Sequence, residues 1–243
     1  MIPDIAQFIL AAGLPYYLLL EKITFIKSKH IFIISATLLL IAIVLSNFFP
    51  NSHLTSFVIL SLLTSLFSIY KATKTTNFYK LGYYLIFVNA PFFILFENEG
   101  AMYSVSLLVS LIGLYLIGQF YEKNYGSANY HHITGITLVR PYIGTFLVFY
   151  LIALALYPPF PNSLYFLSHI FHSELSLLWY MVTITLFFGN FLLAMRVMKK
   201  TLFGRPNSHI HYVHMTIKEK ITHSIIVILL LLLSVNGFKE LLL

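Results

Sequence analysis

The chain has 243 residues, of which 59 % are hydrophobic and only 9 % are charged, and its formal net charge is +7. Soluble domains carry about 25 % charged residues, so this composition excludes a soluble globular protein. The sequence has no cysteine, which excludes disulfides, thiolate metal centres, iron–sulfur clusters and cysteine nucleophiles. We therefore expect an all-α polytopic membrane protein that forms a single membrane domain over residues 1–243.

Apolar runs of about 20 residues predict membrane-spanning helices. The first, third and fourth of these runs are short, so those helices would stand nearly upright or thin the bilayer locally. Pro91 lies inside the fourth run and predicts a kink, with the Asn89 side chain available to a freed carbonyl. The sequence predicts eight helices, over residues 5–20, 31–49, 55–70, 81–96, 101–120, 136–157, 175–197 and 221–238.

Basic residues are confined to one side of this predicted topology. Every lysine and arginine except Lys239 falls in, or borders, a connection on the same side. Because basic connections stay cytoplasmic, we expect a multi-pass protein of the inner (cytoplasmic) membrane with both termini outside. The positive charge is then explained by membrane topology, and no nucleic-acid partner is expected.

The sixth predicted helix runs into the sequence Pro158-Pro159-Phe160-Pro161. Each proline removes a backbone donor, and its ring clashes with the preceding turn. At membrane depth the freed carbonyls need a partner from protein, water or an ion. Interruptions of this kind are typical of the discontinuous helices that form transport sites. We expect Pro158 to Pro161 to interrupt the helix within the membrane, and residues 162–171 to form a short helix that continues the sixth span.

Four titratable side chains near this span are candidates for a proton path. His169 and His172 share a helical face beyond the break, and Glu174 follows them. Histidine titrates near neutral pH, and ionisable residues inside a membrane often mark proton relays. The alternative is that this segment emerges into water, where polar residues occur in any case. Arg140, at the start of the same span, is a further candidate, unless its side chain only reaches the cytoplasmic head groups.

All ten histidines sit in loops or at the ends of predicted spans, and five of the remaining ones form two groups in predicted cytoplasmic connections. His131 and His132 form one group, and His209, His211 and His214 form another, in an alternating segment that predicts a short strand or an interfacial segment. Such spacings can bring imidazoles together, which makes His209, His211 and His214 weak metal candidates. No cysteine or carboxylate joins them at close spacing, so we expect neither a metal nor a cofactor. A histidine-dependent metal-binding membrane enzyme is the alternative that these residues leave open.

Three motifs in this part of the chain resemble a known family. They are Arg140-Pro141-Tyr142-Ile143-Gly144, Ala153-Leu154-Ala155-Leu156-Tyr157-Pro158-Pro159-Phe160-Pro161 and Lys199-Lys200-Thr201-Leu202-Phe203-Gly204. In this order they resemble the proton-conducting antiporter-like subunits of respiratory complex I, Mrp-type antiporters and membrane-bound hydrogenases. The resemblance implies a truncated C-terminal half, in which residues 135–243 supply antiporter-like helices six to eight. Residues 1–134 align with the family only by helix count and topology.

One departure from the family limits what the resemblance implies. Five residues beyond the last proline of the break, where the family carries lysine or glutamate, this chain has Phe166. The resemblance implies a non-catalytic integral membrane subunit of an ion (proton) translocating complex, acting as a proton path or as a scaffold. Complexes of the complex I, Mrp, hydrogenase or bicarbonate-uptake type would supply other membrane subunits as partners. A small stand-alone transporter with its site at the break is a further alternative.

Overall fold

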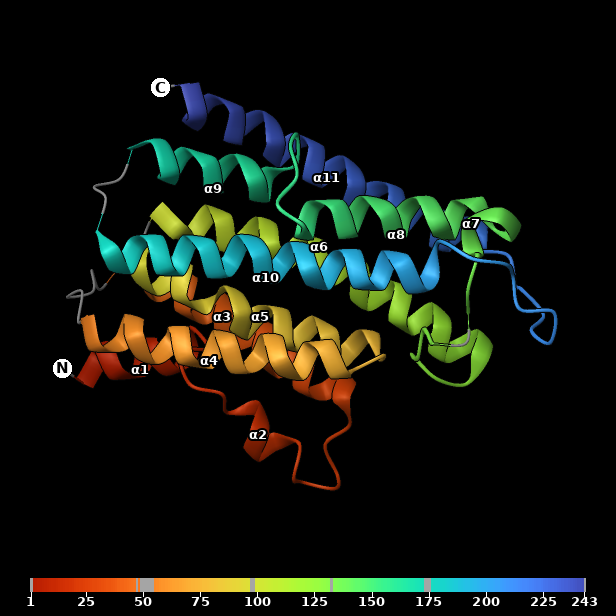
Figure 1. The fold of residues 1–243 in the computed structure, drawn as a ribbon, viewed down its shortest axis with the longest axis horizontal. Coiled ribbons are helices and arrows are strands. Elements are labelled where there is room, and N and C mark those ends of the chain that lie inside the picture. Colours follow the sequence, from red (N-terminus) through yellow and green to blue (C-terminus); the bar gives the residue numbers. More distant parts are fainter. Residues whose placement is uncertain are drawn as a thin grey trace.

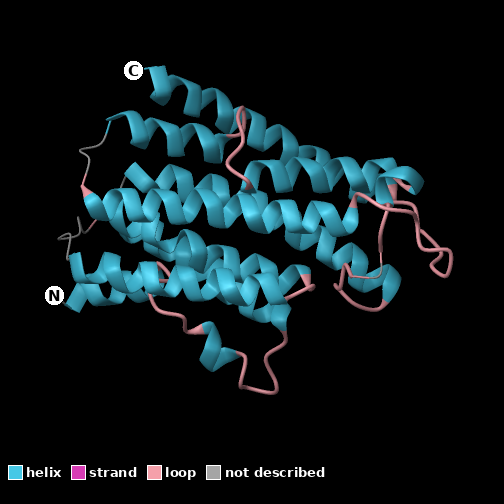
Figure 2. Cartoon of the chain, viewed as in Figure 1, coloured by secondary structure: helices cyan, strands magenta, loops and turns pink. Residues whose placement is uncertain are grey.

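The computed structural model describes residues 2–46, 48, 55–96, 99–131, 133–172 and 176–242. Within these ranges the chain forms helices joined by loops and contains no β-strand (Figure 2). Six of the helices (α3, α4, α5, α6, α10 and α11) are long and apolar enough to cross a membrane. The helices are α1 (Ile2–Leu10), α2 (Tyr17–Leu20), α3 (Ser28–Ser46), α4 (Thr55–Lys74), α5 (Phe78–Phe96), α6 (Glu99–Tyr125), α7 (Ile136–Val139), α8 (Pro141–Leu154), α9 (Pro161–His172), α10 (Leu177–Thr201) and α11 (Ile217–Leu242).

Helix α5 forms the centre of the bundle. It packs against α3, α4, α6 and α10, and 83 % of its most apolar window is buried, compared with 22 % for α11. The helix continues through Pro91 to Phe96. Serines on α4 allow the two backbones to approach closely, and Ser65 Oγ donates to the Val88 carbonyl of α5 at 2.7 Å. Small polar residues commonly mediate helix contacts in membranes. Helix α11 therefore lies at the rim and leaves most of its apolar surface uncovered.

The prediction of one helix over residues 5–20 is wrong. The chain forms α1 and α2, separated by a turn in which Ala12 has a φ of 62°. Gly13 and Pro15 follow, and proline cannot continue a helix because it lacks the amide hydrogen. Thr64 Oγ1 donates to the Gly13 carbonyl at 2.9 Å, which fixes the turn against α4. The turn is thus held by a contact with a distant part of the chain.

Side-chain caps set the start of the last two helices. Ser176 Oγ accepts a hydrogen bond from the Trp179 amide at the start of α10. At the start of α11, the Thr216 amide donates to Glu219 Oε2 at 2.8 Å and the Glu219 amide donates to Thr216 Oγ1 at 3.3 Å. This reciprocal pair is a capping box. It starts α11 at Ile217 rather than at the predicted residue 221.

The basic residues gather at one end of the bundle. Both termini lie at the left in Figure 1, whereas the C-terminal ends of α4, α6 and α10 and the N-terminal ends of α8 and α11 lie at the right. Lysines occupy these right-hand ends, in the last turns of α4, α6 and α10 and the first turn of α11. We call this the basic end.

An arginine of α10 joins α4 to the loop between α6 and α7 at the basic end. Arg196 Nη1 donates to the Ala72 carbonyl at 3.1 Å, to the Thr75 carbonyl at 2.8 Å and to Tyr130 Oη at 3.3 Å. Tyr130 Oη in turn donates to the Thr75 carbonyl at 3.1 Å. Burial raises the pKa of Tyr130, and the neighbouring Arg196 guanidinium opposes part of that rise. The Arg196 side chain therefore holds the carbonyls at the end of α4.

Candidate functional site

The Pro-Pro-Phe-Pro segment lies between two helices. Helix α8 ends at Leu154 and α9 begins at Pro161, and Figure 1 shows the two helices end to end along the long axis of the bundle. Leu156 has a φ of 57°, and the Tyr157 amide donates to the Ile152 carbonyl at 3.3 Å. Phe160 and Pro161 are buried, whereas residues 157–159 are exposed. The segment thus turns outward at the bundle surface before α9 resumes the direction of α8.

A buried amide side chain follows this turn. Asn162, in the first turn of α9, is 0 % exposed, and neither its Oδ1 nor its Nδ2 has a hydrogen-bond partner among the described residues. The neighbouring Ser163 Oγ donates to the Phe160 carbonyl at 2.7 Å. A buried amide without a partner is costly, by about 1–3 kcal/mol in proteins. Water or another polar group that forms hydrogen bonds with the Asn162 side chain is therefore favoured at this position.

His169 lies in an aromatic cluster, not in water. The residue is 8 % exposed, and its ring stacks on Phe96 with centroids 4.6 Å apart and an interplanar angle of 7°. Phe166, five residues beyond Pro161, is 3 % exposed and stacks with Phe92 at 5.7 Å. The segment does not simply emerge into water at His169. His172 ends α9; its side chain and Glu174 lie outside the described residues.

Arg140 has a structural position at the basic end. Its Nε donates to the Tyr212 carbonyl at 2.9 Å, its Nη2 donates to the same carbonyl, and its Nη1 donates to the Val139 carbonyl at 3.0 Å. Tyr212 Oη donates to the Thr134 carbonyl at 2.7 Å. The arginine therefore clamps the loop between α10 and α11 against the start of α8. Arg140 precedes the first residue of α8, whereas His169 lies in the last turn of α9.

The histidines of the α10–α11 loop are not brought together. His209, His211 and His214 are all exposed, and their segment is a loop, so the strand, one of the two predicted alternatives, does not form. Within the described residues, no group of three or more His, Cys, Asp or Glu side chains could hold a metal ion. His131 is also exposed, and His132 lies outside the described residues.

A histidine that sequence reasoning assigned to a span end is buried in the bundle. His223 lies in the second turn of α11 and is 2 % exposed. Its Nδ1 forms a 2.8 Å hydrogen bond with Tyr150 Oη of α8, and its ring stacks on Phe146 at 5.2 Å. Tyr150 and Phe146 are one helical turn apart and present one face of α8 to α11. The capping box at Thr216 was the signal in the sequence that places His223 inside α11 rather than at its start.

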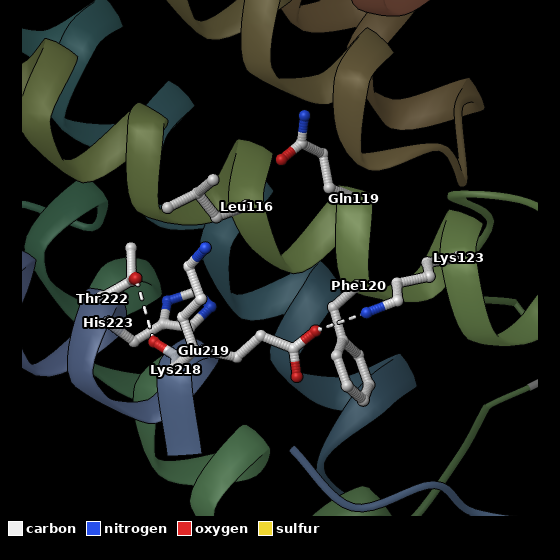
Figure 3. A pocket seen from close by; sticks show the side chains of 8 residues that line it. All are labelled: Leu116, Gln119, Phe120, Lys123, Lys218, Glu219, Thr222 and His223. Carbon is white, nitrogen blue, oxygen red and sulfur yellow. Dashed lines mark hydrogen bonds and ion pairs between the residues drawn. The ribbon is translucent and has the colours of Figure 1, made fainter. Parts of the chain in front are cut away.

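His223 also lines a cavity at the basic end. The cavity has a volume of about 210 Å³ and lies between the last turns of α6 and the first turns of α11 (Figure 3). Lys123 Nζ and Glu219 Oε1 form an ion pair across it at 3.3 Å. The lining residues are Leu116, Gln119, Phe120, Lys123, Lys218, Glu219, Thr222 and His223.

A second buried polar cluster joins three helices in the centre of the bundle. Asn89 Nδ2 donates to Asn190 Oδ1 at 3.0 Å, and Asn190 Nδ2 donates to Asn89 Oδ1 at 2.7 Å. Tyr103 Oη donates to Asn89 Oδ1, and Asn89 Nδ2 also donates to the Leu85 carbonyl at 2.8 Å. Asn89 thus bonds Leu85, one turn before it on α5, and links α5 to α6 and α10. Every polar atom of the two amides has a partner, which is the condition for such a cluster to stabilise a buried site.

Neither the comparison with protein-family models nor the comparison with curated proteins gives a match to this chain. The class follows from the structure: the long apolar helices of the described residues define a multi-pass helical membrane protein. No more particular assignment follows from the comparisons. The resemblance of residues 134–204 to antiporter-like subunits remains an expectation of the sequence.

Proposed function

We propose that this chain is a non-catalytic membrane subunit of a proton-translocating complex, similar to the antiporter-like subunits, and that it acts as a scaffold. In this proposal α8 and α9 together form one discontinuous span, and the segment containing α1 and α2 forms another. With the six long helices these give eight crossings, so that both termini lie on the side opposite the basic end.

The observation that carries the proposal is the interruption between α8 and α9. The helices are in line, and the break leaves the fully buried Asn162 amide without a partner in the described residues. A non-helical backbone at membrane depth occurs where it is covered by protein or lines a hydrated site. The exposed prolines at the bundle surface support a partner subunit that covers this segment.

The buried titratable groups favour a scaffold over a complete proton path. Among the described residues, the buried side chains include no lysine, arginine, aspartate or glutamate, and the buried histidines are His169 and His223. They lie on α9 and α11, and the phenylalanine cluster around Phe166 surrounds the first of them. A proton path needs a chain of titratable or hydrated groups, so we infer that a partner subunit supplies the charged residues.

Replacement of both histidines of α9 by glutamine tests this proposal. H169Q/H172Q keeps polarity but removes titration near neutral pH. We expect proton flux through the intact complex, reconstituted in vesicles, to be unchanged, because the path runs through the partner. Vesicles prepared from membranes that lack this chain provide the control for assembly. A loss of flux with the complex still assembled would instead place the proton path in this subunit.

Purification of the chain from native membranes in mild detergent tests the assembly itself. We expect a stable hetero-complex with other membrane subunits. Recovery of the chain only as a monomer or a dimer of itself would contradict the proposal and favour a stand-alone transporter.

The proposed topology is testable with single cysteines, because the natural chain has none. A cysteine in place of Glu99, at the start of α6, is expected to react with an impermeant thiol reagent added to intact cells. A cysteine in place of Lys200, at the end of α10, is expected to react only after the cells are permeabilised. Labelling in the reverse sense at either position would contradict the proposed topology of eight crossings.

A further inference from the structure

We propose that the cavity between α6 and α11 binds the phosphate group of an anionic phospholipid, with Lys218 as the principal cationic contact. The proposal requires only that the chain spans a membrane and is independent of the scaffold role. The cavity has a volume of about 210 Å³, which is below the roughly 300–1,000 Å³ of pockets that enclose a whole drug-sized ligand. It therefore suits a head group whose hydrocarbon chains remain outside.

The charges around the cavity leave Lys218 as the available cation. Glu219 uses Oε1 in the 3.3 Å ion pair with Lys123 and accepts the Thr216 amide on Oε2 at 2.8 Å. Two lysines and one glutamate line the cavity, so its net charge is +1 with His223 neutral. In the view of Figure 3 the Lys218 side chain extends away from the Lys123–Glu219 pair. An anion bound in the cavity would neutralise this net charge of +1.

The surroundings of the cavity fit a lipid better than free phosphate. Leu116 and Phe120 give it an apolar wall, and the next turns of α11 expose Ile221 (54 %) and Ile225 (59 %) at the rim of the bundle. Acyl chains can lie against these side chains while the phosphate reaches Lys218. The cavity also lies at the basic end, and clusters of lysine and arginine beside membrane helices recognise anionic lipid head groups.

Native mass spectrometry of the whole chain in neutral detergent tests the proposal. The probes are dioleoylphosphatidylglycerol, dioleoylphosphatidylcholine and inorganic phosphate. We expect phosphatidylglycerol to be retained more strongly than the other two. Lys218→Gln should weaken its binding about fivefold, the effect expected for loss of one lysine near an anionic surface. Lys27→Gln removes an exposed lysine from the connection between α2 and α3 and should leave binding unchanged.

A second variant tests the cavity without changing its charge. Leu116→Trp places a larger side chain in the space and should also reduce phosphatidylglycerol binding, while all lysines remain. Equal losses in Lys218→Gln and Lys27→Gln would show diffuse attraction and overturn the proposal. Equal retention of phosphatidylcholine would overturn it in favour of an apolar groove. Displacement of the lipid by equimolar inorganic phosphate would show that the site takes a free anion, which also overturns it.

Discussion

Gly135→Ala is expected to lower the free energy of unfolding by about 3 kcal/mol, from backbone strain of about 1–2 kcal/mol and overpacking of about 1–3 kcal/mol. Gly135 precedes α7 with a φ of 62°, a left-handed conformation that favours glycine. A Cβ atom at this position would lie 2.7 Å from the Gly204 carbonyl oxygen and 2.9 Å from the Pro206 nitrogen. Both are backbone atoms, so no side-chain rotation relieves the contact. The start of α7 would separate from the loop between α10 and α11.

Reversible unfolding in a denaturing detergent, followed by circular dichroism, measures this change. Gly126→Ala is the matched control, since Gly126 also has a positive φ of 80° but no atom within 4 Å of the added Cβ. We expect the control to lose only the conformational part, about 1 kcal/mol. If the two alanine variants are equally destabilised, the close packing of Gly135 against residues 204–206 is not present in the protein.

Asn89→Leu is expected to destabilise the bundle by about 2 kcal/mol, because each buried polar group left without a partner costs about 1–3 kcal/mol. The substitution removes both hydrogen bonds between Asn89 and Asn190 and the acceptor of Tyr103 Oη. Asn190→Leu is expected to cost less, since Asn89 keeps its bonds to the Leu85 carbonyl and to Tyr103.

The double variant Asn89→Leu/Asn190→Leu separates the amide pair from simple loss of packing. It removes both amides, so the Tyr103 hydroxyl is the group of this cluster that is left without its acceptor. We expect the double variant to be no less stable than Asn89→Leu alone, measured in the same unfolding assay. Additive losses would show that the two side chains act independently, which would contradict a bonded pair.

The helical membrane class and the long helices were predictable because they depend on local composition. Apolar runs identified α3, α4, α5, α6, α10 and α11, and the proline cluster marked the segment at which α8 and α9 are separate helices. The split between α1 and α2 depends in part on a distant contact, although Pro15 is a local signal for it. The turn at Gly13 is fixed by Thr64, and this pairing has no local signature.

The polar clusters were harder to predict than the helices for the same reason. Asn89 was recognised only as a neighbour of Pro91, since nothing local to it points to Asn190 on α10. His223 is an exception: the apolar run predicts a span end at this residue, although a local signal, the capping box at Thr216, starts the helix earlier. The sequence makes Arg140 a candidate for proton transfer, but its partner is the carbonyl of Tyr212, whose position depends on how the loop returns to α8.

The hydrogen bonds from Arg196 to the end of α4 have a consequence for the biogenesis of the protein. During synthesis, the helices up to α6 leave the ribosome before Arg196 does, so the Ala72 and Thr75 carbonyls lack their later partner during that interval. Asn89 likewise emerges well before Asn190. The early helices therefore enter the bilayer with two polar sites whose hydrogen-bond partners on α10 are not yet present.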